Sequence, residues 1–212
     1  TSLADLEAVA TRAGDRGDDV VASLEALVEH SLVVAEGSGR LRLLEPVAQY
    51  ARDLLRELGE WDAAARAHAA HYLAVAEEHS SSYRNGGQVV ALTRIDLEHA
   101  NLTAAAERSL TMGDVETPAR MAWELWLYWW LRGHHDHGRR FAENVLQRSE
   151  ALPVTVHGRA ALAAATMAFA MDDMDAAEGW WVLWNHDPRV AASRVAADAK
   201  REFVPVDPQP KL

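Results

Sequence analysis

The amino-acid sequence predicts a mainly α-helical protein with one small β-hairpin near its N-terminal end. Apolar residues recur at helical spacing over most of the chain, and only one short segment is rich in β-favouring residues. Hydrophobic residues make up 49% of the 212 residues, which is enough to bury a sizeable core. We therefore expect a helix, a hairpin and a helix, followed by an array of paired helices.

The first predicted unit covers residues 1–60. Residues 18–32 carry apolar side chains at helical spacing, which predicts a helix. Residues 33–43 place two β-favouring runs on either side of a Gly-Ser-Gly tip, which indicates a hairpin. Pro46 suits the first turn of a following helix over residues 46–58. Helix, hairpin and helix in this order form the closing half of a winged-helix unit.

The second predicted unit, residues 61–184, is an array of helical hairpins with no convincing strand. Its expected helices are joined by short turns rich in Gly and Asp, as in helical repeats. The turns at Gly133 and Asp172 lie about 40 residues apart, near the roughly 34-residue period of tetratricopeptide repeats. We therefore predict a degenerate tetratricopeptide-like array, with Thr117 capping its third helix. The helices are expected at residues 62–78, 88–110, 117–133, 137–150, 156–171 and 175–184.

The third predicted segment, residues 185–212, contains a helix and a proline-rich tail. The tail cannot be helical because each proline removes an amide donor and disfavours helix before it. Residues 189–203 can form an amphipathic helix. The last array helix carries an unusual aromatic cluster, which would be adhesive if exposed. We expect residues 189–203, or a second copy of the chain, to cover this interface of Trp180, Trp181 and Trp184.

Charge and composition exclude several classes of function. The formal net charge of −11 disfavours direct binding to nucleic acid, because phosphate contacts need clustered Lys and Arg. With no cysteine, the chain can form neither a disulfide nor a thiolate metal site. No segment resembles a signal peptide or reaches the roughly 20 apolar residues of a membrane span. A protein of the cytoplasm, without contact to membrane, is the expectation.

The helix with four tryptophans is the most distinctive segment of the array. An aromatic stripe of this kind usually packs in a core. The alternative is an aromatic-lined groove for a ligand or partner, flanked by a small basic patch. Such arginines dock an acidic segment or a phosphate, or else pair with nearby carboxylates. The candidate groove residues are Trp123, Trp126, Trp130, Arg132, Arg139 and Arg140.

Two groups of histidines have the composition of a metal site but not its spacing. His134, His135 and His137 lie in a turn, where neighbouring side chains diverge. His68 and His71 share a helix face, where packing against a neighbouring helix is the expected role. We predict no metal and no other cofactor. No nucleophile lies beside a base in a known motif, so we expect a protein that is not an enzyme.

Several segments resemble one family of regulators. Residues 27–33 (LVEHSLV) and 39–52 (GRLRLLEPVAQYAR) are similar to the winged-helix segment of large bacterial STAND/NB-ARC-type ATPase regulators, which are most abundant in actinobacteria. Residues 68–73 (HAAHYL), 97–102 (LEHANL) and 129–134 (WWLRGH) resemble the tetratricopeptide-like region that follows in those proteins. The resemblance covers most of the chain, up to about residue 177.

The resemblance implies a role in transcription regulation. In this family a P-loop ATPase core and an output domain are joined to a helical sensor. The chain has no G-x-x-x-x-G-K-[ST] loop, so it would be the relay and sensor portion, with the ATPase core and output domain outside it as partners. Many relatives carry Met-His-Asp after the hairpin, where this chain has Leu43, Leu44 and Glu45. Leucine cannot donate to a phosphate, which argues against nucleotide sensing here.

The leading hypothesis is therefore a non-catalytic relay and sensor module of a transcriptional regulator. Its helical-repeat groove would bind an effector or a protein partner of unknown identity. The alternative is a small-molecule-binding or enzymatic protein that evolved from the same scaffold, with the Trp-rich helix lining a pocket.

Overall fold

The computed structural model describes residues 1–14, 17–36, 39–84 and 86–186. Within these ranges the chain forms nine α-helices and one two-stranded sheet, which confirms the predicted mainly α fold with a small β-hairpin. The chain divides into two compact units, Thr1–Glu124 and Leu125–Leu212. None of the helices in the described ranges is long and apolar enough to cross a membrane.

The first helix, α1 (Leu3–Ala13), was not expected from apolar periodicity. Its start is fixed by a capping box: the Ser2 hydroxyl accepts the Asp5 amide N–H, and the Asp5 carboxylate accepts the Ser2 amide N–H. Gly14 ends the helix in a left-handed conformation, with φ of 105°. The Ser-x-x-Asp spacing was thus a usable signal for this helix.

The predicted helix–hairpin–helix order is confirmed in unit 1. Helix α2 (Gly17–Glu29) leads into strands β1 (Val33–Ala35) and β2 (Leu41–Leu43), which pair antiparallel, and α3 (Glu45–Glu57) follows with Pro46 in its first turn. The hairpin gains a further pairing, because Ser2 forms an antiparallel bridge with Arg40. The residues before α1 are therefore fixed against β2 by the backbone.

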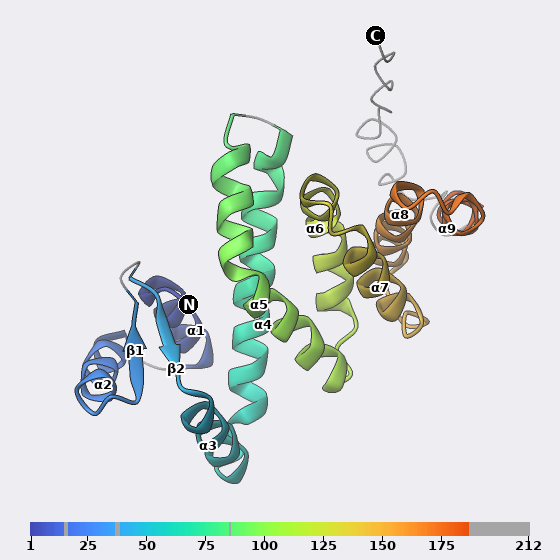
Figure 1. Cartoon of the computed structure of the whole chain (residues 1–212). Coiled ribbons are helices and arrows are strands. Elements are labelled where there is room, and N and C mark those ends of the chain that lie inside the picture. Colours follow the sequence, from blue (N-terminus) through green and yellow to red (C-terminus); the bar gives the residue numbers. More distant parts are fainter. Residues whose placement is uncertain (15–16, 37–38, 85, 187–212) are drawn as a thin grey trace. The chain divides into compact units, whose positions relative to one another are not determined.

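Two long helices form the centre of unit 1. Helix α4 (Trp61–Ser80) and helix α5 (Gln88–Thr111) lie side by side and antiparallel, joined through the 3-10 turn η1 (Ser81–Arg84) (Figure 1). Their shared face is buried and rich in alanine, with large side chains such as Tyr72 and Ile95 between. Helix α1 packs against α4. Figure 1 shows α2 and the hairpin on the same side of the pair as α1.

The remaining helices follow the predicted order, with ends shifted by up to four residues. They are α6 (Glu116–Arg132), α7 (His135–Leu146), α8 (Val154–Ala170) and α9 (Met174–His186). The expectation that Thr117 caps α6 is wrong: the helix begins at Glu116, and the Asp114 carboxylate accepts the Thr117 amide N–H at 3.1 Å. Asp caps helices at least as well as Thr, and Asp114 lies just before α6, where its side chain reaches the first turn of the helix.

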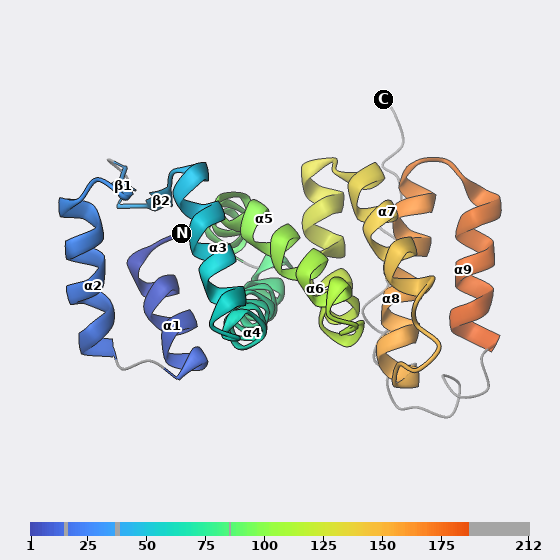
Figure 2. The ribbon, with the colours of Figure 1, turned by 90° about the horizontal axis from the view of Figure 1, so that it is seen from below.

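In unit 2, α8 packs between α7 and α9 (Figure 2). Its residues from Gly158 to Ala168 are buried, apart from the partly exposed Arg159, and six of the buried residues are alanine. Small side chains on all faces allow neighbouring helices to approach closely. The closest approach involves Gly138 of α7, since a Cβ there would lie 2.6 Å from the Trp129 ring and 3.0 Å from the Met167 sulfur.

Gly138→Ala should therefore lower the free energy of unfolding by about 1–3 kcal/mol, the usual effect of overpacking a core. Gly179→Ala is the matched control, because Gly179 also lies in a helix but a Cβ there meets nothing within 4 Å. The control should be neutral or stabilising by up to about 1 kcal/mol. The free energies of unfolding of both variants can be measured by urea unfolding. Equal changes in the two variants would mean that the contact of residue 138 with Trp129 does not limit the packing.

Candidate functional site

Five charged or titratable side chains from separate segments meet inside unit 1. Asp5 comes from α1, Arg40 directly precedes β2, His71 comes from α4, and Arg94 and Glu98 come from successive turns of α5. We call these residues the charge cluster. Glu98 is 0% exposed and Asp5 is 3% exposed, so both carboxylates are removed from water. Buried charges of this kind persist only when they are paired and hydrogen-bonded.

The Asp5 carboxylate is held from two sides. Its Oδ1 pairs with His71 Nε2 at 2.9 Å and with the Arg94 guanidinium, and its Oδ2 accepts the Ser2 hydroxyl at 2.5 Å. Burial by itself would raise the pKa of Asp5, but the hydrogen bonds from Ser2, His71 and Arg94 outweigh it and lower the pKa to about 2. An ionised carboxylate only accepts, so His71 Nε2 carries the proton of this bond.

The Glu98 carboxylate joins the hairpin to α5. Its Oε1 accepts from Arg40 at 2.6 Å and from Arg94 at 2.9 Å, and its Oε2 accepts the Asn101 amide at 2.7 Å. Burial would raise the pKa of Glu98, but Arg40 and Asn101 outweigh it, so the pKa is lowered. Arg40 also donates to the Leu97 carbonyl at 2.9 Å. One arginine therefore binds both the side chain and the backbone of α5.

The charge cluster is built to hold elements together. Arg94 bridges the two carboxylates, each of which has hydrogen-bond donors on both of its oxygens. Carboxylates saturated in this way have little capacity left to bind a metal or to move a proton. Removing one partner of a buried ion pair is strongly destabilising, because the other charge stays buried without compensation. The cluster thus links α1 and the hairpin to the α4–α5 pair.

Sequence analysis did not predict the charge cluster. The spacing of Arg94 and Glu98 at i and i+4 suggests only an ordinary surface ion pair. The partners Asp5 and Arg40 lie 89 and 58 residues away from Arg94 and Glu98, respectively. His71, predicted to pack against a neighbouring helix, binds Asp5 of α1 through its Nε2, and its ring lies 4.9 Å from that of Tyr72 on its own helix. Only the fold brings these residues together.

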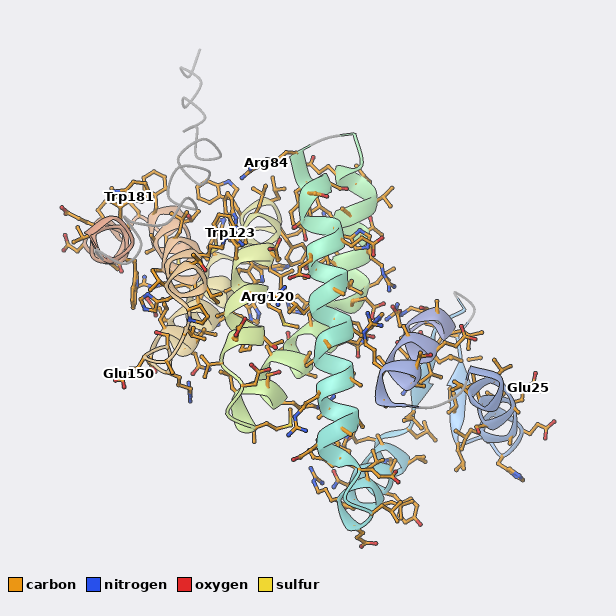
Figure 3. All side chains as sticks on the ribbon, turned by 180° about the vertical axis from the view of Figure 1, so that it is seen from behind. Glu25, Arg84, Arg120, Trp123, Glu150 and Trp181 are labelled. Carbon is orange, nitrogen blue, oxygen red and sulfur yellow. The ribbon has the colours of Figure 1, made fainter. Side chains whose placement is uncertain are left out.

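The Trp-rich helix divides its tryptophans between burial and partial exposure. Trp129 is 1% exposed, Trp123 and Trp126 are half-buried, and Trp130 is 37% exposed (Figure 3 labels Trp123). Trp123 belongs to unit 1, and the other three belong to unit 2. The Trp130 ring stacks on Phe169 at 6.4 Å between centroids. The predicted groove stays a prediction, and the Trp130–Phe169 pair is its most exposed aromatic part within unit 2.

The arginines predicted to flank the groove have different surroundings. Arg139 pairs with Glu143 at 2.9 Å and with Asp173 at 2.8 Å, which raises its pKa. Arg140 pairs with Asp136 at 2.6 Å on an exposed helix face. Arg132 is exposed at the end of α6. Ion pairing within the chain is the role that the structure gives to Arg139 and Arg140.

The prediction that His134, His135 and His137 lie in a turn is wrong for two of them, because His134 is the N-cap of α7 and His135 and His137 lie in its first turn. Each of the three rings lies near a different aromatic ring. His134 lies 5.9 Å from Tyr128, His135 lies 5.8 Å from Trp130, and His137 lies 6.0 Å from Trp129. No group of three or more potential metal ligands gathers among the described residues.

The predicted C-terminal interface is described only in part. Trp180 and Trp181 are half-buried on α9 (Trp181 is labelled in Figure 3). The side chain of Trp184 and residues 189–203, expected to cover the cluster, lie outside the described part of the chain.

The chain is similar to part of three mycobacterial proteins whose provisional name is HTH-type transcriptional regulator. It is 35% identical over 163 residues to one protein of Mycobacterium bovis and to one protein in each of two strains of Mycobacterium tuberculosis. The match covers 74% of the chain, and the chain spans only 18% of the length of each relative. No protein-family description matches the chain, and no solved structure matches it.

Replacing Asp5 should test the strength of the charge cluster. Asp5→Asn should lower the free energy of unfolding at pH 7 by about 3–5 kcal/mol, as expected for a broken buried pair. The folded pKa of about 2 is below the ordinary 3.8, so this stabilisation is complete above about pH 4 and is lost as the pH falls through about 2. Asp62→Asn, which removes only an exposed pair with Arg66, should cost less than about 1 kcal/mol.

His68 gives a second, separate dependence on pH. Burial, then the charges of Arg108 and His71, lower the pKa of His68 from 6.5 to about 4. The unfolded chain therefore takes up a proton between pH 6.5 and 4 that the folded chain does not, so stability falls as the pH falls through this window. His68→Phe keeps a ring against Tyr72 and should flatten this part of the stability profile, measured by urea unfolding at several pH values. An unchanged slope would contradict a neutral, buried His68.

Proposed function

We propose that the chain is a non-catalytic relay and sensor module of a bacterial transcriptional regulator. The match to a part of three longer proteins, each named as an HTH-type regulator, supports a regulatory role. The charge cluster is the observation that carries the relay. It joins a helix–hairpin–helix segment of winged-helix type to the first long helical pair of the array.

The relay would work by moving α5 relative to the hairpin. Arg40 is bound to Glu98 and to the Leu97 carbonyl, so a shift of α5 must either carry the hairpin with it or break buried ion pairs. A link of this kind favours a small number of discrete arrangements over continuous sliding. An effector that prefers one arrangement would then change the position of the hairpin.

The effector or partner would bind the array, and the hairpin side would meet the rest of the regulator. The exposed stack of Trp130 on Phe169 is a suitable contact for a partner, since partly exposed aromatic residues are enriched at interfaces. Leu43 and Leu44, each 41% exposed, lie where STAND-type relatives carry Met and His. We propose that these leucines pack against an ATPase core, without contacting its nucleotide.

Two arginines of the hairpin, Arg40 just before β2 and Arg42 within it, test the relay. Arg40→Gln breaks the charge cluster, whereas Arg42→Gln removes only an exposed pair with Glu36 at 3.3 Å. In the organism that encodes the chain, Arg40→Gln should change transcript levels at the same genes as deletion of the whole gene, and Arg42→Gln should leave them unchanged. If deletion itself alters no transcripts, the regulatory role is wrong. If both arginine variants behave like the parent, the cluster is not part of the relay.

A further inference from the structure

The side chain of Arg108, in the last turn of α5, has no acceptor among the residues that the structure describes. Its guanidinium makes no hydrogen bond or ion pair with any residue in the described part of the chain, although the side chain is half-buried. Burial and the charge of Arg52 lower its pKa, against a smaller opposing effect of Glu107. A guanidinium has five N–H donors, and buried donors are normally matched by acceptors. Arg108 therefore stands where an external anion would be stabilised.

Two guanidinium groups meet at the same indole ring. Arg56 lies 4.7 Å from the centre of the Trp61 ring and Arg108 lies 5.7 Å from it, both within cation–π range. Arg56 comes from the end of α3, Trp61 begins α4, and Arg108 ends α5. The ends of α3 and α5 thus place two positive charges at the Trp61 ring, at the start of α4. We call this meeting point of the three helices the junction.

The carboxylates near these arginines are exposed and easily displaced. Arg52 pairs with Glu45, which is 82% exposed, and Arg56 pairs with Asp53, which is 53% exposed. Exposed pairs of this kind contribute about 0–1 kcal/mol each. An anion of higher charge can therefore take over the donors of Arg52 and Arg56 at small cost.

An unpaired polar atom lies next to the same junction. His68 Nδ1, about two turns further along α4 than Trp61, is buried and has no hydrogen-bond partner among the described residues. The neighbouring charge of Arg108 helps to keep this ring neutral. At the same end of the helix, Glu60 stands in the capping position of α4 but makes no side-chain capping bond, so the first N–H groups of α4 have no such acceptor.

We propose that Arg56 and Arg108, which both lie at the Trp61 ring, together with the neighbouring Arg52, bind the phosphate group of a small molecule. A phosphate carries up to two negative charges and directs its oxygens tetrahedrally, so arginines from two different helices can each contact it. A carboxylate has one charge and two oxygens in a plane, which suits a single guanidinium fork. This site needs no P-loop, and the proposal is independent of the regulatory role.

Titration with inorganic phosphate, followed by calorimetry and by NMR of the Trp61 indole N–H, tests the site in the whole chain. Binding is expected with shifts at Trp61, and Arg108→Gln should weaken it at least tenfold. Arg148→Gln is the matched control, because it removes the same charge from an exposed arginine in the turn after α7, which among the described residues donates only to Asn144. Its affinity for phosphate should equal that of the parent. Melting temperatures of both variants show whether each still folds.

A second readout separates a built site from general attraction of anions. Bound phosphate cancels the charge of Arg108, so the pKa of His68 should rise from about 4 on addition of phosphate, and should not respond in Arg108→Gln. A phosphate monoester such as glycerol phosphate should compete if the phosphate group is what the site recognises. Binding of an acidic peptide without binding of either phosphate probe would overturn the proposal, as would equal weakening by Arg108→Gln and Arg148→Gln.

Discussion

Unit 1 depends on the pairing of two buried carboxylates with two arginines. Glu98 is completely buried, and it can remain ionised only because Arg40 and Arg94 both donate to it. This requirement fixes the hairpin against α5, and the Asp5 branch of the same cluster fixes α1 against α4 and α5. Apolar burial is sparse in this region, since Val33 is the one buried apolar residue described before α4. Ion pairs therefore do part of what a hydrophobic core usually does, which is to hold α1 and the hairpin against α4 and α5.

Helix α5 carries two arginine environments of opposite character. Arg94 lies near its start and is fully engaged with Asp5 and Glu98, whereas the Arg108 guanidinium, in its last turn, has no acceptor among the described residues. Fourteen residues of helix separate the two positions by about 20 Å. The same helix therefore carries residues of the charge cluster, which bind the hairpin, and Arg108 of the proposed phosphate site. An anion bound at Arg108 and the hairpin bound at Glu98 would both contact α5.

The fold class and most helix ends could be predicted because they depend on local rules. The spacing of apolar residues predicted the approximate ranges of α2 to α9, and the Gly-Ser-Gly tip predicted the hairpin. Helix α1 was missed because its signal is a capping pattern, Ser2 and Asp5, and not a long apolar stripe. The charge cluster could not be predicted, since one sequence carries no record of which charges meet across 58 to 89 residues. The exposure of individual tryptophans could not be predicted either, because Trp129 and Trp130 are neighbours in the sequence but one is buried and the other is partly exposed.

The alanine-rich helix α8 has a consequence for how unit 2 tolerates change. Alanine loses no rotamer freedom on folding, so the stack of α7, α8 and α9 is assembled with little loss of side-chain entropy. The same feature leaves few flexible side chains to absorb a change in volume, and a methyl group added to α8 presses on a helix at either side. Accepted substitutions in α8 should therefore occur together with a smaller residue on α7 or α9. Among homologues, covariation of residue size between these three helices would be the evolutionary trace of that close packing.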